Sequence, residues 1–206
     1  MTDRAQKKGY LVVPVEAVDP DTMASSIAEF LTAAGLPDAA DSGAPKKSAG
    51  AWAEVLLAGY RKDPATILGQ SWPDQTGELV AMRAVPFVSV CEHHLLPFYG
   101  EAHLAYLPDG QLTGLSRLAA LVDCLARRLQ VQERLTEQLV DVVMDSLQPR
   151  GAACILEAVH DCVGARTLQH RGSKVQTVAY RGEFSDNPGL QDRFLRLVLG
   201  GGVAGL

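Results

Sequence analysis

The chain has 206 residues, 47% of them hydrophobic and 21% charged, which is typical of one globular domain with a buried core and an appended segment. A formal net charge of −5 without a basic cluster disfavours nucleic acid as a partner. No apolar run reaches the length of about 18 residues that a membrane-spanning helix needs. The N-terminus has no signal-peptide pattern, and the cysteines are too few for a disulfide scaffold, so we expect a cytoplasmic protein with thiols or metal ligands.

The first part of the chain is predicted to be an arm followed by two helices. Residues 1–20 have mixed polarity, and the apolar spacing of residues 22–34 predicts a first helix. Residues 36–44 have the composition of a loop, and Pro45 can open a second helix. Residues 61–78 are mostly polar and contain scattered proline and glycine, which predicts a long connection.

The hydrophobic period changes at residue 79, where strand pairs begin to alternate with helix pairs. Strands are predicted at residues 79–90, 100–108, 151–163 and 174–182. One helix between the pairs carries Leu118 to Leu129 on its apolar face, with Ser116 as a possible N-cap, and the next carries Leu135 to Leu147. A short helix near residues 187–199 precedes a glycine-rich tail. Strands that arrive in antiparallel pairs indicate an α+β fold.

Two short segments contain the residue types that bind metal ions. Cys91-Glu92-His93-His94 lies between the first two strands, and His160-Asp161-Cys162 ends the third. Thiolate and imidazole are the ligands that zinc prefers, so the ligand set is predicted to be Cys91, His94 and Cys162, with a fourth position open for water. His93 and His160 would then serve as acid or base groups. The alternative is that these are buried thiols and structural histidines.

The other cysteines and histidines fit structural roles. Cys124 lies among leucines of a predicted helix and Cys154 in an apolar strand, so both are expected in the core. His103 lies in an alternating strand and His170 in a loop, where structural or solvent-facing positions are expected.

A zinc ion can lower the pKa of bound water to about 7. The segments at 91–94 and 160–162 alone therefore suggest hydrolysis at an electrophilic carbon with several proton transfers.

At these residues the sequence resembles the GTP cyclohydrolase I family, from about residue 44 to residue 199. The motifs that carry the resemblance, in order, are CEHH at 91–94, YLP at 106–108, GLS at 114–116, QVQERLT at 130–136, the HxC at 160–162 and Arg166 beyond it. The resemblance implies the tunnelling fold, in which antiparallel strand pairs with helices on one side assemble into a barrel. It divides the chain into an N-terminal arm and helix, residues 1–43, and a catalytic domain, residues 44–206.

The family's activity is implied with it. One zinc ion per subunit is held by the residues that match Cys91, His94 and Cys162, and water attacks the imidazole carbon of guanine in GTP. Formate leaves, and the product is 7,8-dihydroneopterin triphosphate, a precursor in pterin and tetrahydrofolate biosynthesis. The resemblance also implies a homodecamer with sites at subunit interfaces.

Individual roles carry over by position. His93 matches the histidine that protonates the imidazole nitrogen, and His160 matches the one that helps to open the ribose. Glu133 matches the carboxylate that recognises guanine, since a carboxylate can accept two parallel hydrogen bonds from the ring. The remaining substrate contacts that the resemblance implies are Gln132 at the pyrimidine edge, Ser116 near the ribose, and Arg117, Arg166 and Lys47 at phosphate. Without the motif, Gln132 and Glu133 would fit a solvated helix start, and Ser116 only an N-cap.

The sequence departs from the family pattern mainly where phosphate is bound. Lys47 replaces an arginine, Arg117 replaces a lysine, and Ala120 stands where the family has another arginine; Thr167 replaces a glycine after Arg166. Arginine and lysine are not equivalent on phosphate, because only arginine presents a planar fork.

Three functions therefore stay open: a GTP cyclohydrolase I with an altered phosphate clamp, a specialised paralogue acting on a nucleotide with fewer phosphates or stopping at a ring-opened intermediate, and a paralogue that binds zinc or a partner without turnover. The related nitrile-reducing enzymes use a cysteine nucleophile and no zinc, and the intact HxC segment disfavours that activity.

Overall fold

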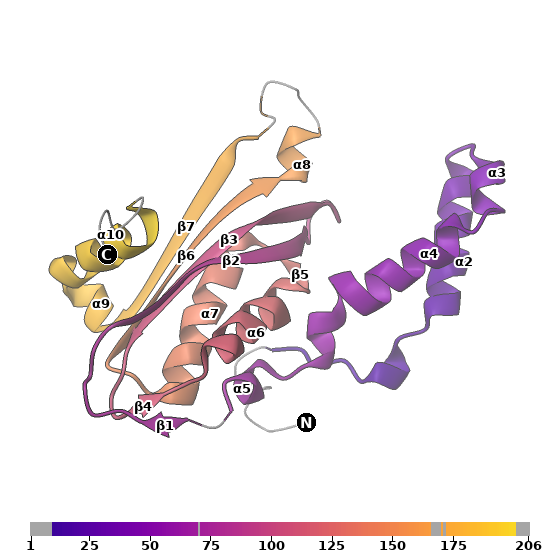
Figure 1. Cartoon of the computed structure of the whole chain (residues 1–206). Helices are drawn as coiled ribbons and strands as arrows, with labels where there is room; N and C mark the ends of the chain where they lie inside the picture. Colours follow the sequence, from indigo (N-terminus) through magenta and orange to yellow (C-terminus); the bar gives the residue numbers. More distant parts are fainter. Residues whose placement is uncertain (1–9, 70, 166–169, 171, 201–206) are drawn as a thin grey trace.

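The computed structural model describes residues 10–69, 71–165, 170 and 172–200. Its N-terminal part is helical and projects to one side of the main sheet (Figure 1). The elements there are η1 (Val15–Ala17), α2 (Pro20–Ala33), α3 (Pro37–Ala40), α4 (Ala44–Ala51), the π-helical η2 (Trp52–Leu56), the 3-10 helix η3 (Ala58–Arg61) and α5 (Pro64–Ile67).

Both N-terminal helices are confirmed, with different ends. The first begins at Pro20, because the Asp19 side chain accepts hydrogen bonds from the backbone N–H groups of Asp21 and Thr22 and so caps the helix. The segment predicted as loop contains α3, where Pro37 occupies the first turn. Since α2 packs against α4, the two helices form one unit across residue 44, and the predicted division of the chain there stays a prediction.

The main sheet has five strands in the order β5-β2-β3-β6-β7. β2 (Val80–Cys91), β3 (Pro97–Leu107), β6 (Gly151–His160) and β7 (Lys174–Gly182) pair antiparallel in that order, and β5 (Leu129–Gln130) pairs parallel to the end of β2. β1 (Trp72–Pro73) and β4 (Gln111–Leu112) form a small separate sheet. The predicted strand pairs are confirmed, although β6 ends at His160, where α8 (Asp161–Gly164) begins.

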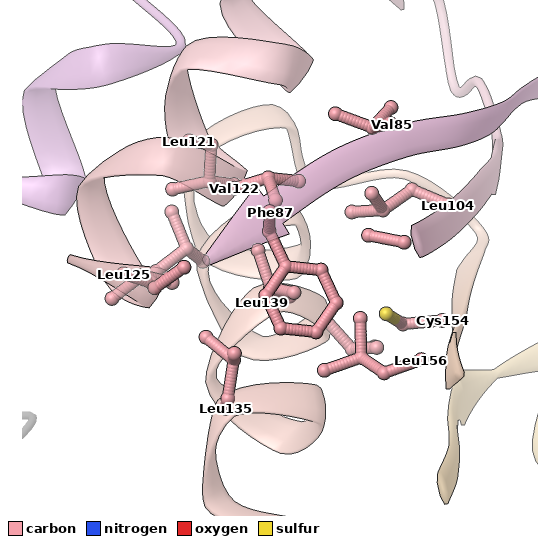
Figure 2. Packing of buried hydrophobic residues seen from close by; sticks show 14 of the residues in the cluster. Val85, Phe87, Leu104, Leu121, Val122, Leu125, Leu135, Leu139, Cys154 and Leu156 are labelled. Atoms are coloured by element: carbon pink, nitrogen blue, oxygen red, sulfur yellow. The ribbon is translucent and has the colours of Figure 1, made fainter. Parts of the chain in front are cut away.

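Two helices cover one face of the sheet: α6 (Leu115–Ala126) and α7 (Gln132–Leu147). Leu129, which the sequence placed on the first of these helices, lies in β5 instead, and the N-cap of α6 is Gly114 rather than Ser116. In Figure 2 the Phe87 ring lies between leucines of the two helices and side chains of β6. The fully buried leucines of this core include Leu121, Leu125, Leu135 and Leu139.

A smaller cluster occupies the opposite face at one end of the sheet. There α9 (Glu183–Asp186) and α10 (Pro188–Leu199) bring Phe184 and Phe194 against Ala153 and Ile155 of β6. Because successive side chains of a strand point to opposite faces, β6 contributes Cys154 and Leu156 to the first core and Ala153 and Ile155 to the second.

The residues assigned to structural roles occupy them. Cys154 and Cys124 are buried, as expected, and burial raises the pKa of both thiols. His103 is also buried, and its Nδ1 accepts a hydrogen bond of 3.1 Å from the backbone N–H of Ala84, which has a φ of 55° in a β-bulge. Exposed His170 lies at the edge of a gap in the described residues. No helix in the described residues is long and apolar enough to cross a membrane.

We predict that Leu139→Ala lowers the free energy of unfolding by about 2–5 kcal/mol, because the side chain is fully buried and its removal leaves a cavity between α7 and the sheet. Alanine is a better helix former than leucine, so helix propensity does not contribute to the loss. Urea unfolding measures the change. Glu137→Ala, at an exposed position of the same helix, should shift the midpoint little. Equal shifts for the two variants would contradict this account of the core.

Candidate metal centre and nucleotide site

The sheet topology brings the two predicted metal-binding segments together. β2 and β6 lie on either side of β3, and both run antiparallel to it, so they end at the same edge of the sheet. Cys91 is the last residue of β2, His94 lies in the following turn, and Cys162 lies in α8 directly after β6. Residues about 70 positions apart in the chain therefore meet at one end of three adjacent strands.

The ligand atoms of Cys91, His94 and Cys162 all lie within 4.8 Å of one another. Cys91 Sγ and His94 Nδ1 are 3.6 Å apart. Tetrahedral zinc with ordinary Zn–S and Zn–N bonds requires a separation of about 3.6 Å between such atoms, so this pair fits the ion without rearrangement. Both cysteines are buried and His94 is exposed, which leaves the site open on one side. These three residues could hold a metal ion.

Backbone hydrogen bonds shape the turn that carries His94. The N–H of Cys91 donates to the carbonyl of Leu96, and the N–H of Leu95 donates to the carbonyl of Cys91, at 2.9 and 2.8 Å. Leu95 has a φ of 55°, a left-handed conformation that is uncommon outside glycine. The turn thus closes tightly enough for the side chains of Cys91 and His94 to meet.

An ion pair that the sequence did not reveal anchors the same turn to α7. Arg134 donates to the Glu92 carboxylate, to the side-chain oxygen of Gln130 and to the carbonyl of Leu129. The Arg134 guanidinium lowers the pKa of Glu92. Both residues lie inside motifs already singled out, but a pairing across 42 positions has no periodicity that could have indicated it.

The two remaining histidines lie outside this group of ligand atoms. His93 is exposed, and its Nε2 lies 3.8 Å from the carboxylate of Glu92. His160 is the last residue of β6 and stacks on the buried ring of Phe98, with ring centroids 4.6 Å apart and an interplanar angle of 2°. Burial lowers the pKa of His160, and the nearby charge of Glu133 offsets part of that shift.

Gln132 and Glu133 form the first turn of α7 beside His160. Glu133 is exposed, whereas Gln132 is 2% exposed and its side-chain oxygen lies 2.7 Å from His160 Nε2. Gln132 therefore does not fit the solvated helix start that was the alternative interpretation of the sequence. The metal group, both histidines and this helix start therefore share one edge of the sheet.

The predicted phosphate and ribose contacts lie elsewhere in the chain. Ser116 and Arg117 are in the first turn of α6, whereas the far end of this 12-residue helix leads to β5 beside Cys91, about 18 Å along the helix axis. Lys47 is exposed on α4, among the projecting helices. Arg166 and Thr167 lie outside the described residues. Within one chain, the residues at the metal edge and the described phosphate and ribose contacts therefore form separate groups.

Together, the fold and the site define an α+β protein with a Cys–His–Cys metal-type group at the edge of an antiparallel sheet. Residues 23–199 match the model of the GTP cyclohydrolase I family, and the chain belongs to this family. The antiparallel strand pairs with α6 and α7 on one face confirm the tunnelling fold expected from the sequence.

Relatives named GTP cyclohydrolase 1 support this membership. The protein of Chlorobium phaeovibrioides is 44% identical over 144 residues, which are 69% of this chain and 65% of that protein. The protein of Brucella suis is 40% identical over 156 residues, 75% of this chain and 73% of that protein. The match therefore spans just under two thirds of the first relative. A solved structure of the archaeosine synthase QueF-Like in the apo form aligns with a TM-score of 0.42 at 19% identity, covering 52% of this chain and 97% of that one.

We predict that Cys91→Ala and Cys162→Ala each lose the metal ion, because each removes one of the two thiolates of a three-residue ligand set. His93→Ala and His160→Ala should retain it, since neither side chain belongs to the group of ligand atoms. Elemental analysis of the purified variants measures the difference. Full metal content in both cysteine variants would remove the assignment, and loss of metal from His93→Ala would exchange the roles of His93 and His94.

Proposed function

We propose that the protein is a zinc-dependent cyclohydrolase that opens the imidazole ring of guanine in GTP, releases formate and yields 7,8-dihydroneopterin triphosphate. The observation that carries the proposal is the meeting of the Cys–His–Cys group, His160 and the start of α7 at one sheet edge. The family membership and the names of the relatives support it. The product would enter pterin and tetrahydrofolate biosynthesis.

Zinc is the proposed ion because two thiolates and one imidazole suit its softness and its tetrahedral geometry. Cys91, His94 and Cys162 would hold it, and a zinc ion so bound supplies hydroxide near neutral pH. The open side left by exposed His94 gives the guanine ring access. The remaining steps of the reaction are assigned to side chains of the protein.

Proton transfers are assigned to the two free histidines. His93 is exposed beside Glu92, where it can deliver a proton to the imidazole nitrogen of guanine as the ring opens. His160 is held by stacking on Phe98 and by Gln132, which suits a base acting on ribose hydroxyls. Exposed Glu133 would accept two parallel hydrogen bonds from the guanine ring N–H and amine.

The position of Ser116, Arg117 and Lys47 supports a site shared between subunits. A nucleotide whose guanine lies beside Glu133 would find Ser116 and Arg117 on a second copy more readily than in the first turn of its own α6. An apolar hollow of about 650 Å³ beside α2, lined by Ile27, Phe30 and Leu95 among others, also favours association. We propose a homo-oligomer, a decamer by analogy with the family.

A second candidate follows from the altered phosphate residues. Ala120 is half-buried on α6, one helical turn from Arg117, so one cation of the family clamp is missing on that face. A lost charge-assisted contact costs about 1.5–3 kcal/mol. A substrate with fewer phosphates, or a reaction that stops at a ring-opened intermediate, would tolerate that loss.

Mass spectrometry of the products from GTP, GDP, GMP and guanosine distinguishes the candidates. We predict formate release from GTP and a lower KM for GTP with Ala120→Arg, because the substitution restores a cation near phosphate. A preference for a nucleotide with fewer phosphates would support the second candidate. No turnover of any of the four by the zinc-loaded protein would contradict both. Unchanged constants for Ala120→Arg would show that position 120 does not face phosphate.

Mixing two inactive variants tests the shared site. Arg117→Ala and His160→Ala should each have low activity, and co-assembly of the two should restore it in about a quarter of the sites by random assortment. Recovery is expected because some sites would combine an intact metal edge from one subunit with an intact α6 from another. The control mixes His93→Ala with His160→Ala, which lie at the same edge and should not complement. Activity in a stable monomer would contradict the proposal.

A further inference from the structure

The side-chain amide of Gln132 is surrounded by protein groups on every polar side. Its Nε2 lies 3.1 Å from the carbonyl oxygen of Leu156, 3.0 Å from that of Val175 and 3.1 Å from Oγ1 of Thr177. Its Oε1 lies 2.7 Å from Nε2 of His160. A buried amide with this set of neighbours has only one satisfactory orientation.

The partners of Nε2 are all acceptors. Carbonyl oxygens can only accept, and the threonine is constrained as well: the Thr136 hydroxyl lies 2.7 Å from the carbonyl of Gln132 and donates to it. The Thr177 hydroxyl, 2.6 Å from Thr136 Oγ1, must therefore donate to Thr136 and offer a lone pair to Gln132. Rotating the amide by 180° would place its oxygen against three acceptors and leave buried polar groups without hydrogen bonds, which is unfavourable.

With the amide fixed, the oxygen that faces His160 can only accept a hydrogen bond. The proton between them must therefore reside on His160 Nε2. The neutral ring then carries its lone pair on Nδ1, for which the described residues provide no hydrogen-bond partner. Phe98, fully buried and stacked on the same ring, fixes the ring plane, and its own edge-to-face contact with Phe87 at 6.0 Å ties it to the core.

We propose that Gln132 is a positioning residue that holds His160 as the Nε2–H tautomer, so that Nδ1 is the atom that exchanges protons with the substrate. The inference deepens the proposed function and depends on it only for the identity of the substrate. In the forward step a substrate O–H gives its proton to Nδ1, and the O–H electron pair stays on the substrate oxygen. The imidazolium so formed keeps its Nε2–H bond to Gln132 and later returns the proton from Nδ1.

Solid-state ¹⁵N spectra of the sedimented, zinc-loaded protein labelled at histidine test the tautomer directly. The measurement is made at about pH 8.5, roughly two units above the usual histidine pKa. The His160 signals are identified by their loss in His160→Asn. The wild type should show a proton on Nε2 and a bare Nδ1. A proton on Nδ1 of His160 in the wild type would overturn the inference.

Substitution of Gln132 separates positioning from substrate contact. Gln132→Met should give a mixture of tautomers and lower kcat roughly 10–100-fold with little change in KM, a share of the usual contribution of an acid–base group. Gln132→Glu keeps an acceptor opposite Nε2 and should retain the Nε2–H tautomer, but its second oxygen faces the acceptors of Leu156, Val175 and Thr177, so the variant should be less stable than the wild type. Unchanged tautomer and kcat in Gln132→Met, or a rise in KM alone, would show that Gln132 serves the guanine edge instead.

A matched control is available on the same helix. Gln138 accepts a hydrogen bond from Gln130 at 2.9 Å, and Gln138→Met should leave the His160 spectrum and kcat unchanged. The tautomer is read without turnover, so absence of cyclohydrolase activity would count against the proposed function and leave this inference standing. If Gln132→Met fails to fold, the wild-type spectrum still decides the outcome, because a proton on Nδ1 of His160 would overturn the inference by itself.

Discussion

β2 and β6 run in the same direction on either side of β3, and the whole candidate site depends on that arrangement. Strands that run in the same direction end at the same edge of a sheet. Cys91, at the end of β2, and Cys162, just after β6, are neighbours for this reason. The tight turn between β2 and β3 then adds His94. The two cores on opposite faces hold the strands in this register, so the meeting of the two cysteines depends on the sheet, whereas the position of His94 depends on the turn after β2.

The first turn of α7 connects this edge to the helical layer. Arg134 fixes the turn that carries the histidines through Glu92, and Gln132 fixes His160 through its side-chain oxygen. A buried polar network is stable only when each member has its partner, and the hydroxyls of Thr136 and Thr177 complete this one. The same helix start thus supports the candidate metal ligands and the proposed proton-transfer groups, while Glu133 beside them is exposed.

Two of the residues proposed to contact phosphate, Lys47 and Arg117, lie in the described part of the chain. Lys47 lies on α4 and Arg117 in the first turn of α6, and both are positions at which the sequence departs from the family. If they are contributed across the proposed interface, Lys47 and Arg117 can change without disturbing the sheet edge, because no hydrogen bond among the described residues of the metal turn involves them. Substrate range in this protein would therefore vary independently of its chemistry.

The sequence by itself determined the alternation of strand and helix pairs, the buried roles of Cys124 and Cys154, and the residues of the Cys–His–Cys group that could hold a metal ion, because periodicity and residue type are local properties. Its errors were local as well: Ser116 does not cap α6, Leu129 belongs to β5, and a short helix replaces part of the loop before Pro45. Only the tertiary structure decided the Glu92–Arg134 pair, the stacking of His160 on Phe98 and the burial of Gln132. These depend on which strands lie side by side, and contacts across tens of residues leave no pattern along a single chain.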